Sequence, residues 1–304
     1  MNRHPSVLAV FAVLAVFAAP APAQPPPWEE PVFGSELRLY GFQYDNFFQA
    51  PDGEPQEEVT LTRVEGRFGA RPSQGSPFEL YARGRFDSYS DGLDEAWAVG
   101  AGLRFGRTPH EADLYLEHEE DRPVFDVGDE FDRANVLGLV GKYGYRVTRS
   151  WQVTGLAELR QEEFDRTTGK DNDFVSGGAA LRYRGWGYDF SPELGVEFGQ
   201  RSADDPNEDH DQREVWLKVR SIPVEDLYLS LRFRVRDREY TVGDPAAGNF
   251  GREDDRRDVT LAADYTLLDW LGVNGYVAYE DADSTKESRT YDWLLTGVGL
   301  TFGW

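Results

Sequence analysis

Segments with one apolar face recur along almost the whole chain. In residues 226–237, large apolar side chains occupy every second position, and basic or polar side chains lie between them. The apolar set is Leu227, Leu229, Leu231, Phe233 and Val235. Such alternation is typical of a β-strand with one face in an apolar environment. Strands of a soluble sandwich need only about five or six residues, whereas these segments run for roughly ten to fourteen, the length of a tilted strand that crosses a membrane.

The same alternation predicts fourteen strands. They span residues 36–49, 58–70, 77–88, 94–106, 111–119, 134–147, 150–162, 173–185, 188–200, 213–222, 226–237, 257–268, 271–281 and 289–304. This pattern favours an all-β, antiparallel transmembrane β-barrel of about fourteen strands, with twelve to sixteen compatible. The first segment is irregular, because Leu37 and Leu39 set one phase and Phe42 and Tyr44 set the other. A bulge or an inward aromatic is therefore expected there.

The connections alternate between short turns and longer acidic loops. The longer segments, residues 50–57, 89–94, 119–133, 162–173, 200–213, 237–257 and 281–289, hold 31 acidic and 12 basic residues in a chain of formal net charge −23. So acidic a chain is a poor partner for nucleic acid. In membrane barrels the short turns face the periplasm and the longer loops face the exterior, so we expect an acidic extracellular rim.

The first residues have the pattern of a secretory signal peptide. Arg3 and His4 precede an apolar run over residues 7–19, and Ala21, Pro22 and Ala23 form the small-residue pattern of a cleavage site. This small-residue pattern predicts cleavage after Ala23. A retained membrane anchor is not expected, because the apolar run of about thirteen residues is shorter than the roughly 20 that a spanning helix needs. This predicts a signal peptide over residues 1–23, a proline-rich periplasmic lead-in over 24–35 and a barrel over 36–304. The chain has no cysteine, so neither a disulfide nor a thiolate metal site is expected.

The last strand carries an aromatic-ended pattern of apolar and small residues. Its apolar face continues to Phe302 and Trp304, and its other face includes Gly297 and Gly299. Here the chain resembles bacterial outer-membrane β-barrel proteins, whose assembly signal has a polar residue, a glycine and two spaced aromatics. Gly297 stands at the polar position, and the final aromatic is tryptophan. The resemblance implies the outer membrane of a Gram-negative cell, with the barrel-assembly machinery, outer-membrane lipids and lipopolysaccharide as partners.

The other face of the strands predicts a charged inner wall. Its candidate lumen-lining residues carry both signs of charge and are Arg83, Arg85, Arg182, Arg184, Arg220, Arg232, Arg234, Arg236, Glu158, Glu193, Glu197 and Asp264. Eight strands enclose packed side chains and sixteen enclose an aqueous channel, so fourteen lie between the two. Unpaired charges in a dry interior cost several kcal/mol each, so these residues predict water, extensive pairing or both.

In size and strand number the chain is similar to OmpG-like monomeric porins. That resemblance implies a porin-like channel for passive diffusion of small hydrophilic solutes, without a cofactor. A closed structural or interaction barrel, whose acidic loops contact lipopolysaccharide, cations or a partner, is the alternative. A hydrolase at the rim is a further alternative, since His118 and His210 lie beside acidic residues near predicted loops. No catalytic residue and no metal ligand is assigned, although the acidic loops leave binding of Ca²⁺ or Mg²⁺ open.

Two further features leave alternatives open. Arg232, Arg234 and Arg236 lie on one inward face, where they either form an anion-attracting stripe or are paired with acids such as Asp258 and Asp264. With the acidic rim, the stripe predicts weak net cation selectivity. The longest loop, residues 237–257, is either a gate that narrows the lumen or a disordered segment.

Overall fold

The computed structural model describes residues 32–45, 58–90, 95–124, 132–166, 168–184, 190–286 and 289–303. The predicted signal peptide, residues 24–31 of the predicted lead-in and Trp304 lie outside the described residues. Within the described ranges, no helix is both long and apolar enough to span a membrane.

The described part of the chain forms fourteen strands and two short 3-10 helices. The strands are β1 (Val32–Tyr44), β2 (Val59–Arg71), β3 (Phe78–Tyr89), β4 (Ala96–Arg107), β5 (His110–Val124), β6 (Asp132–Arg146), β7 (Trp151–Phe164), β8 (Asn172–Tyr183), β9 (Phe190–Ala203), β10 (His210–Val224), β11 (Leu227–Tyr240), β12 (Glu253–Leu268), β13 (Leu271–Ser284) and β14 (Tyr291–Gly303). The helices are η1 (Thr168–Lys170), before β8, and η2 (Pro206–Glu208), before β10.

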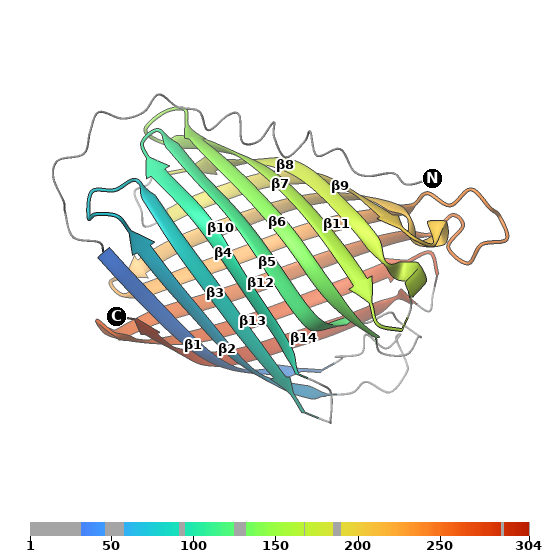
Figure 1. Ribbon diagram of the computed structural model, residues 1–304, viewed down its shortest axis with the longest axis horizontal. Coiled ribbons are helices and arrows are strands. Elements are labelled where there is room, and N and C mark those ends of the chain that lie inside the picture. The colour runs from blue at the N-terminus through green and yellow to red at the C-terminus, as the bar shows by residue number, and fades with distance from the viewer. Residues whose placement is uncertain are drawn as a thin grey trace.

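Each strand pairs antiparallel with its neighbours in sequence, and β1 pairs with β14 to close a barrel of tilted strands (Figure 1). The closing register runs from Glu36 opposite Gly303 to Tyr44 opposite Leu295. Closure leaves no sheet edge exposed, and every strand can satisfy its backbone hydrogen bonds on both sides. The fold is the predicted antiparallel β-barrel, and the predicted strand number is confirmed.

The outer surface of the barrel is apolar. Leu80, Val99, Leu194 and Val298 are 50–71% exposed, and most other large apolar residues of the strands also point outward. A soluble monomer rarely exposes a continuous apolar patch of more than a few hundred Å². This exterior suits a lipid bilayer, in which every backbone polar group must be paired within the protein.

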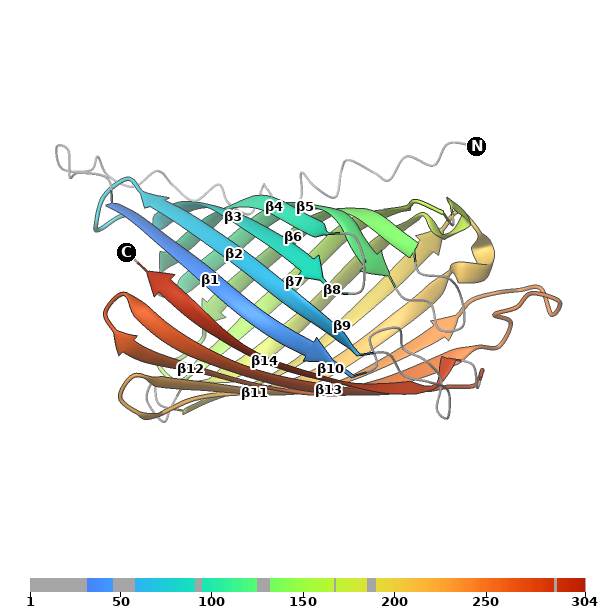
Figure 2. The ribbon, with the colours of Figure 1, turned by 90° about the horizontal axis from the view of Figure 1, so that it is seen from below.

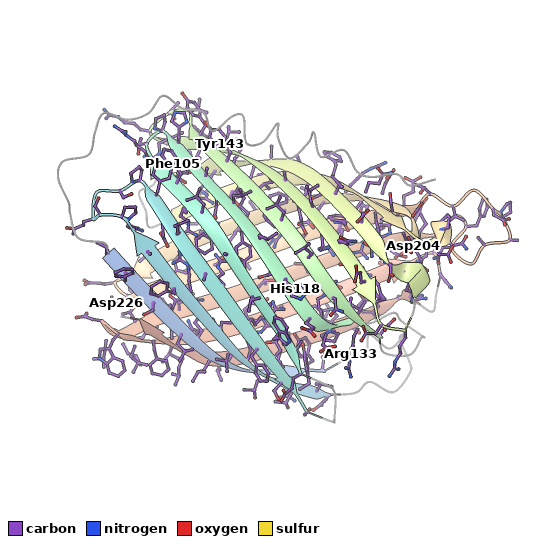
Figure 3. The ribbon with its side chains drawn as sticks, viewed as in Figure 1. Phe105, His118, Arg133, Tyr143, Asp204 and Asp226 are labelled. Atoms are coloured by element: carbon purple, nitrogen blue, oxygen red, sulfur yellow. The ribbon has the colours of Figure 1, made fainter. Side chains whose placement is uncertain are left out.

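The connections lie at the two ends as the sequence predicted. Two-residue turns join β4 to β5, β10 to β11 and β12 to β13 at one end, which we call the turn end. The longer connections lie at the opposite end, which we call the loop end (Figure 2). Phe105 and Tyr143 lie toward the turn end and Arg133 and Asp204 toward the loop end (Figure 3). Asp226, in the turn between β10 and β11, has φ 66°, a conformation that Asp tolerates better than most residues.

The strand boundaries differ from the predictions mainly at the loop end. Three strands are longer there than predicted. β5 ends only at Val124, β10 already begins at His210, and β12 begins at Glu253, so all three reach into segments that were predicted to be loops. β1 begins at Val32, so residues 32–35 belong to the barrel and not to the lead-in. In the sequence the charged residues of these extensions are typical of a loop. In the structure some of them point into the barrel. Part of the charge assigned to the rim therefore belongs to the inner wall.

The irregular phase of β1 results from inward aromatics. β1 pairs with β2 without a register shift, so there is no bulge, and Tyr40 and Phe42 occupy inward positions. Phe42 is buried against Leu61, Ala278 and Leu295. The alternative with inward aromatics is thus confirmed.

Two glycines of β14 make room for these aromatic rings. Gly297 lies opposite Phe42 and Gly299 opposite Tyr40, and a Cβ atom on either glycine would clash with the facing ring. Covering strand glycines with aromatic rings from the next strand is a known way to stabilise a sheet. Gly297 and Gly299 are therefore required for packing where the barrel closes. Their predicted role as an assembly signal, with Phe302 and Trp304, stays a prediction.

Candidate functional site

The predicted wall residues lie on the inside of the barrel. Ten of the twelve line inner cavities: Arg83, Arg85, Arg182, Arg220, Arg232, Arg234, Arg236, Glu158, Glu193 and Glu197. Arg184 follows β8 and lies 3.6 Å from Glu111, which lines another cavity. Asp264 is hydrogen-bonded to Asn274, an inward residue of β13, and no arginine of the described residues forms an ion pair with it, so the alternative of pairing with the ladder does not hold for Asp264. Alternation along the strands is sufficient to place this set.

One carboxylate forms ion pairs with all three residues of the arginine ladder, which consists of Arg232, Arg234 and Arg236. Glu214 of β10 lies 3.0 Å from Arg232, 3.5 Å from Arg234 and 3.2 Å from Arg236. Arg234 is also paired with Asp258 of β12. Three guanidinium groups thus share two carboxylates, so the ladder is partly neutralised and keeps an excess of positive charge. Pairing with Asp258 was one of the expected alternatives, whereas Glu214 was not recognised.

A second arginine pair is held between β8, β9 and β10. Arg182 and Arg220 both bind Glu193, with Arg220 Nη1 3.4 Å from Glu193 Oε2. Nearby, Ser176 donates a 2.7 Å hydrogen bond to Glu197. Glu158 lies 3.2 Å from Arg160. Most wall charges therefore have a partner, as a partly enclosed interior requires.

The wall of β3 has a different arrangement. Arg85 binds Glu119 and lies 3.3 Å from Asp87. The Arg83 guanidinium lies over the rings of Tyr81 and Tyr115, 5.1 and 4.9 Å from their centroids. Stacking on both rings stabilises this cation without a carboxylate partner.

The lumen contains a series of adjoining cavities. A cavity of about 550 Å³ lies at the loop end, one of about 430 Å³ shares Glu158, Glu197 and Arg232 with it, and one of about 450 Å³ shares Arg182 with the second and reaches Thr108 at the turn end. Their linings are charged and roomy enough to hold water. The adjoining cavities span the wall from one end of the barrel to the other.

Several wall residues were missed in the sequence. Arg122, Arg201, Arg238 and Arg256 line the cavity at the loop end, although they fall in segments predicted as loops. Glu214 has the same strand parity as Lys218 and Arg220, and this signal was sufficient to find it. Arg201, Arg238 and Arg256 also continue the inward parity of their strands, but their charged neighbours hide the alternation. Arg122 is out of phase with the rest of β5, because the register shifts between Glu119 and Arg122.

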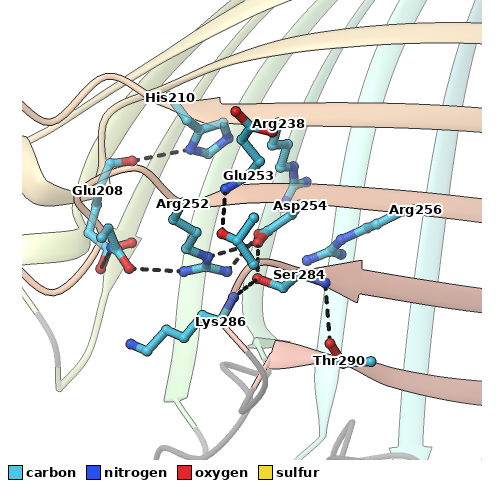
Figure 4. A network of polar contacts seen from close by, with 12 residues as sticks. Glu208, His210, Arg238, Arg252, Glu253, Asp254, Arg256, Ser284, Lys286 and Thr290 are labelled. Atoms are coloured by element: carbon cyan, nitrogen blue, oxygen red, sulfur yellow. Dashed lines mark hydrogen bonds and ion pairs between the residues drawn. The ribbon is translucent and has the colours of Figure 1, made fainter.

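A buried ion pair lies at the loop end. Arg252 binds Asp254 at 2.8 and 2.6 Å and donates a hydrogen bond to Asn249 (Figure 4). Asn249 in turn donates to the backbone oxygen of Asn207 and to Glu208. These contacts fasten the segment between β11 and β12 to the segment between β9 and β10.

This segment does not behave as the long loop expected from the sequence. Because β11 runs to Tyr240 and β12 starts at Glu253, only residues 241–252 connect them. The segment extends beyond the barrel end (Figure 2), and of its residues Arg252 lines the cavity at the loop end. The lumen gate stays a prediction.

We expect deletion of residues 243–248 to leave the single-channel conductance of the reconstituted barrel unchanged, because these residues lie outside the lumen. Asn249 and Arg252 stay in place in this variant. As a control, Arg252→Ala removes the ion-pair partner of the buried Asp254 and leaves it only the hydrogen bond from Ser284, so this variant is expected to loosen the loop end and raise current noise. A rise in conductance after the deletion would show that the segment does narrow the lumen in a membrane.

The three histidines of the described ranges are not paired with carboxylate or serine side chains. His118 points outward against Trp97, with ring centroids 5.5 Å apart. His210 is buried, and its Nδ1 lies 3.2 Å from the backbone oxygen of Glu208. His110 begins β5 instead of lying in a turn, and its Nδ1 lies 2.7 Å from the Tyr143 hydroxyl. Among the described residues, no histidine is hydrogen-bonded to a carboxylate or a serine, and no group of three or more acidic or histidine side chains is arranged to hold a metal ion.

Comparison with known proteins gives structural likenesses only. No protein-family model and no curated protein sequence matches the chain. A bacterial polysaccharide outer membrane secretin matches with 12% identity and a TM-score of 0.49, over 88% of this chain and 97% of the secretin. The anion-selective porin of Comamonas acidovorans matches with 8% identity and a TM-score of 0.48, over 90% of this chain and 99% of the porin. A loop-deletion mutant of the outer membrane protein OmpT of Vibrio cholerae matches with 12% identity and a TM-score of 0.46, over 90% of this chain and 99% of the mutant. None of these likenesses assigns a function to the chain.

Proposed function

We propose that the protein is an outer-membrane channel through which small hydrophilic solutes diffuse passively. The observation that supports this most directly is the series of adjoining, charge-lined cavities from the loop end to the turn end. A barrel that served only as a scaffold could fill this space with apolar side chains at lower cost, because buried ion pairs are often no more stabilising than well-packed apolar residues. The charged wall is therefore explained by the need to keep water and solutes in the lumen.

The orientation follows from the two ends. The acidic loop end faces the cell exterior, and the turn end faces the periplasm. Cations gather at the acidic mouth, and the arginine-rich wall opposes them inside, so a weak net preference for cations is expected.

The function is tested by ion conductance after the purified barrel is reconstituted into a planar bilayer. We expect discrete conductance steps, because water-filled cavities that adjoin one another carry ions. The alternative, a closed barrel that acts as a scaffold or binds a partner through its acidic loops, predicts a folded protein without conductance.

A further inference from the structure

The cavity at the loop end has an unusual surplus of basic side chains. Among the described residues, ten basic and six acidic side chains line its volume of about 550 Å³. This surplus lies behind an acidic mouth, so a simple attraction of cations does not account for it. The question is which of these cations lack a partner.

Most of the arginines in this cavity are paired. Arg122 and Arg160 bind Glu162, at 2.6 and 3.0 Å. The ladder of Arg232, Arg234 and Arg236 is bound by Glu214 and Asp258, and Arg252 is bound by Asp254, as described above.

Arg201 and Arg238 differ from these residues. Arg201 Nη2 donates a 3.1 Å hydrogen bond to the backbone oxygen of Lys170, and Arg238 Nε donates a 3.1 Å hydrogen bond to the side-chain oxygen of Gln212. No carboxylate of the described residues lies within ion-pair distance of either guanidinium. The Nε of Arg201 is buried and has no hydrogen-bond partner. Two positive charges without a described carboxylate partner thus face the same cavity, and one of them, Arg201, also has an unused buried donor.

The strand register brings these two arginines to opposite sides of β10. Arg201 of β9 lies opposite His210, and Arg238 of β11 lies opposite Gln212. With strands about 4.8 Å apart and successive same-face residues about 7 Å apart, their Cα atoms are separated by about 12 Å. Both side chains line the same cavity of about 550 Å³. Arg256 of β12 lies opposite Arg236 and is labelled with Arg238 in Figure 4. Its Nε is buried without a hydrogen-bond partner, but its Nη1 lies 3.8 Å from Glu280.

We propose that Arg201 and Arg238 form a binding site for the oxyanion group of a small solute, a carboxylate or a phosphate. The planar, forked donors of arginine match the oxygens of such a group and bind it with charge-assisted hydrogen bonds. The anion neutralises the surplus of positive charge and accepts hydrogen bonds from guanidinium groups that have no carboxylate partner among the described residues. This proposal rests on the proposed channel function only in that the solute reaches the site through the lumen.

The site is tested by calorimetric titration of the folded, detergent-solubilised barrel with inorganic phosphate and, separately, with succinate, at constant ionic strength in chloride. We expect the wild type to bind at least one of the two, which shows whether phosphate or carboxylate is preferred. Arg201→Gln and Arg238→Gln are each expected to weaken binding about tenfold, since a hydrogen bond to a charged group is lost. Arg238→Lys is expected to weaken it too, because the forked donors are lost while the charge remains.

Arg213→Gln is the matched control. Arg213 is one residue from Gln212, at the same height as Arg238, but it lies on the outer face with its side chain 64% exposed. Its loss removes the same charge from the other side of the wall, so binding is expected to change by less than about twofold. An equal loss of binding in Arg213→Gln, or no binding of either anion by the folded wild type, overturns the site. A barrel that conducts ions but binds neither anion overturns the site and leaves the channel standing. A barrel that binds an anion but does not conduct overturns the channel and leaves the site standing.

Discussion

Replacing Gly297 with valine is expected to prevent most of the protein from reaching its closed, heat-modifiable form. The valine side chain would occupy the space of the Phe42 ring, at the seam where β14 meets β1. Forcing extra atoms into a packed site typically costs about 1–3 kcal/mol, and here the cost falls on the strand pair that closes the barrel. Electrophoretic mobility with and without heating measures the closed fraction.

The control for this variant is Gly41→Val. Gly41 is on β1 next to Phe42, but no atom lies within 4 Å of where its Cβ would be, so closure should be unaffected. The double variant Gly297→Val/Phe42→Ala removes the clashing ring and should recover part of the closed form. Normal closure of the single Gly297→Val variant would show that the seam does not depend on this glycine–aromatic contact.

Removing the arginine ladder is expected to increase cation selectivity clearly. The variant Arg232→Ala/Arg234→Ala/Arg236→Ala deletes three positive charges and leaves Glu214 and Asp258 without these partners. A single charge about 5 Å from a permeating ion changes its local concentration by a few-fold in water, so we expect the cation-to-anion permeability ratio to rise by about threefold or more. Reversal potentials across a salt gradient measure this ratio.

The opposite change serves as a control for the ladder. Glu214→Gln removes the carboxylate that the three arginines share and is expected to shift selectivity toward anions. If both variants fold and conduct but keep the selectivity of the wild type, the arginines and Glu214 act only as structural ion pairs.

The barrel and the direction of its side chains could be predicted because both depend on local alternation. In β11, for example, parity alone placed Arg232, Arg234 and Arg236 on the inner wall. The ends of the strands were harder to predict at the loop end. There Arg201 and Arg238 alternate with other polar residues, so neither face of the strand is apolar. A strand end of this kind cannot be told from a loop by its composition.

Apart from the pairing of the arginine ladder with Asp258, the partners of the wall residues could not be predicted, because they depend on register between strands. Arg236 lies opposite Glu214 only when β10 and β11 are aligned as the structure has them. Likewise, the inward position of Phe42 depends on the space that Gly297 leaves, 255 residues further along the chain. Such relations join residues that are far apart in sequence, and composition within one strand carries no information about them.

The central claim is that the lumen forms a continuous water path, and single-channel recording tests it most directly. The purified, heat-modifiable barrel is added to a planar bilayer, with the unfolded chain at the same concentration as a control. We predict discrete conductance steps for the folded protein and none for the unfolded chain. A barrel that inserts and stays folded but never conducts would contradict the channel and leave the closed interaction barrel as the account of this protein.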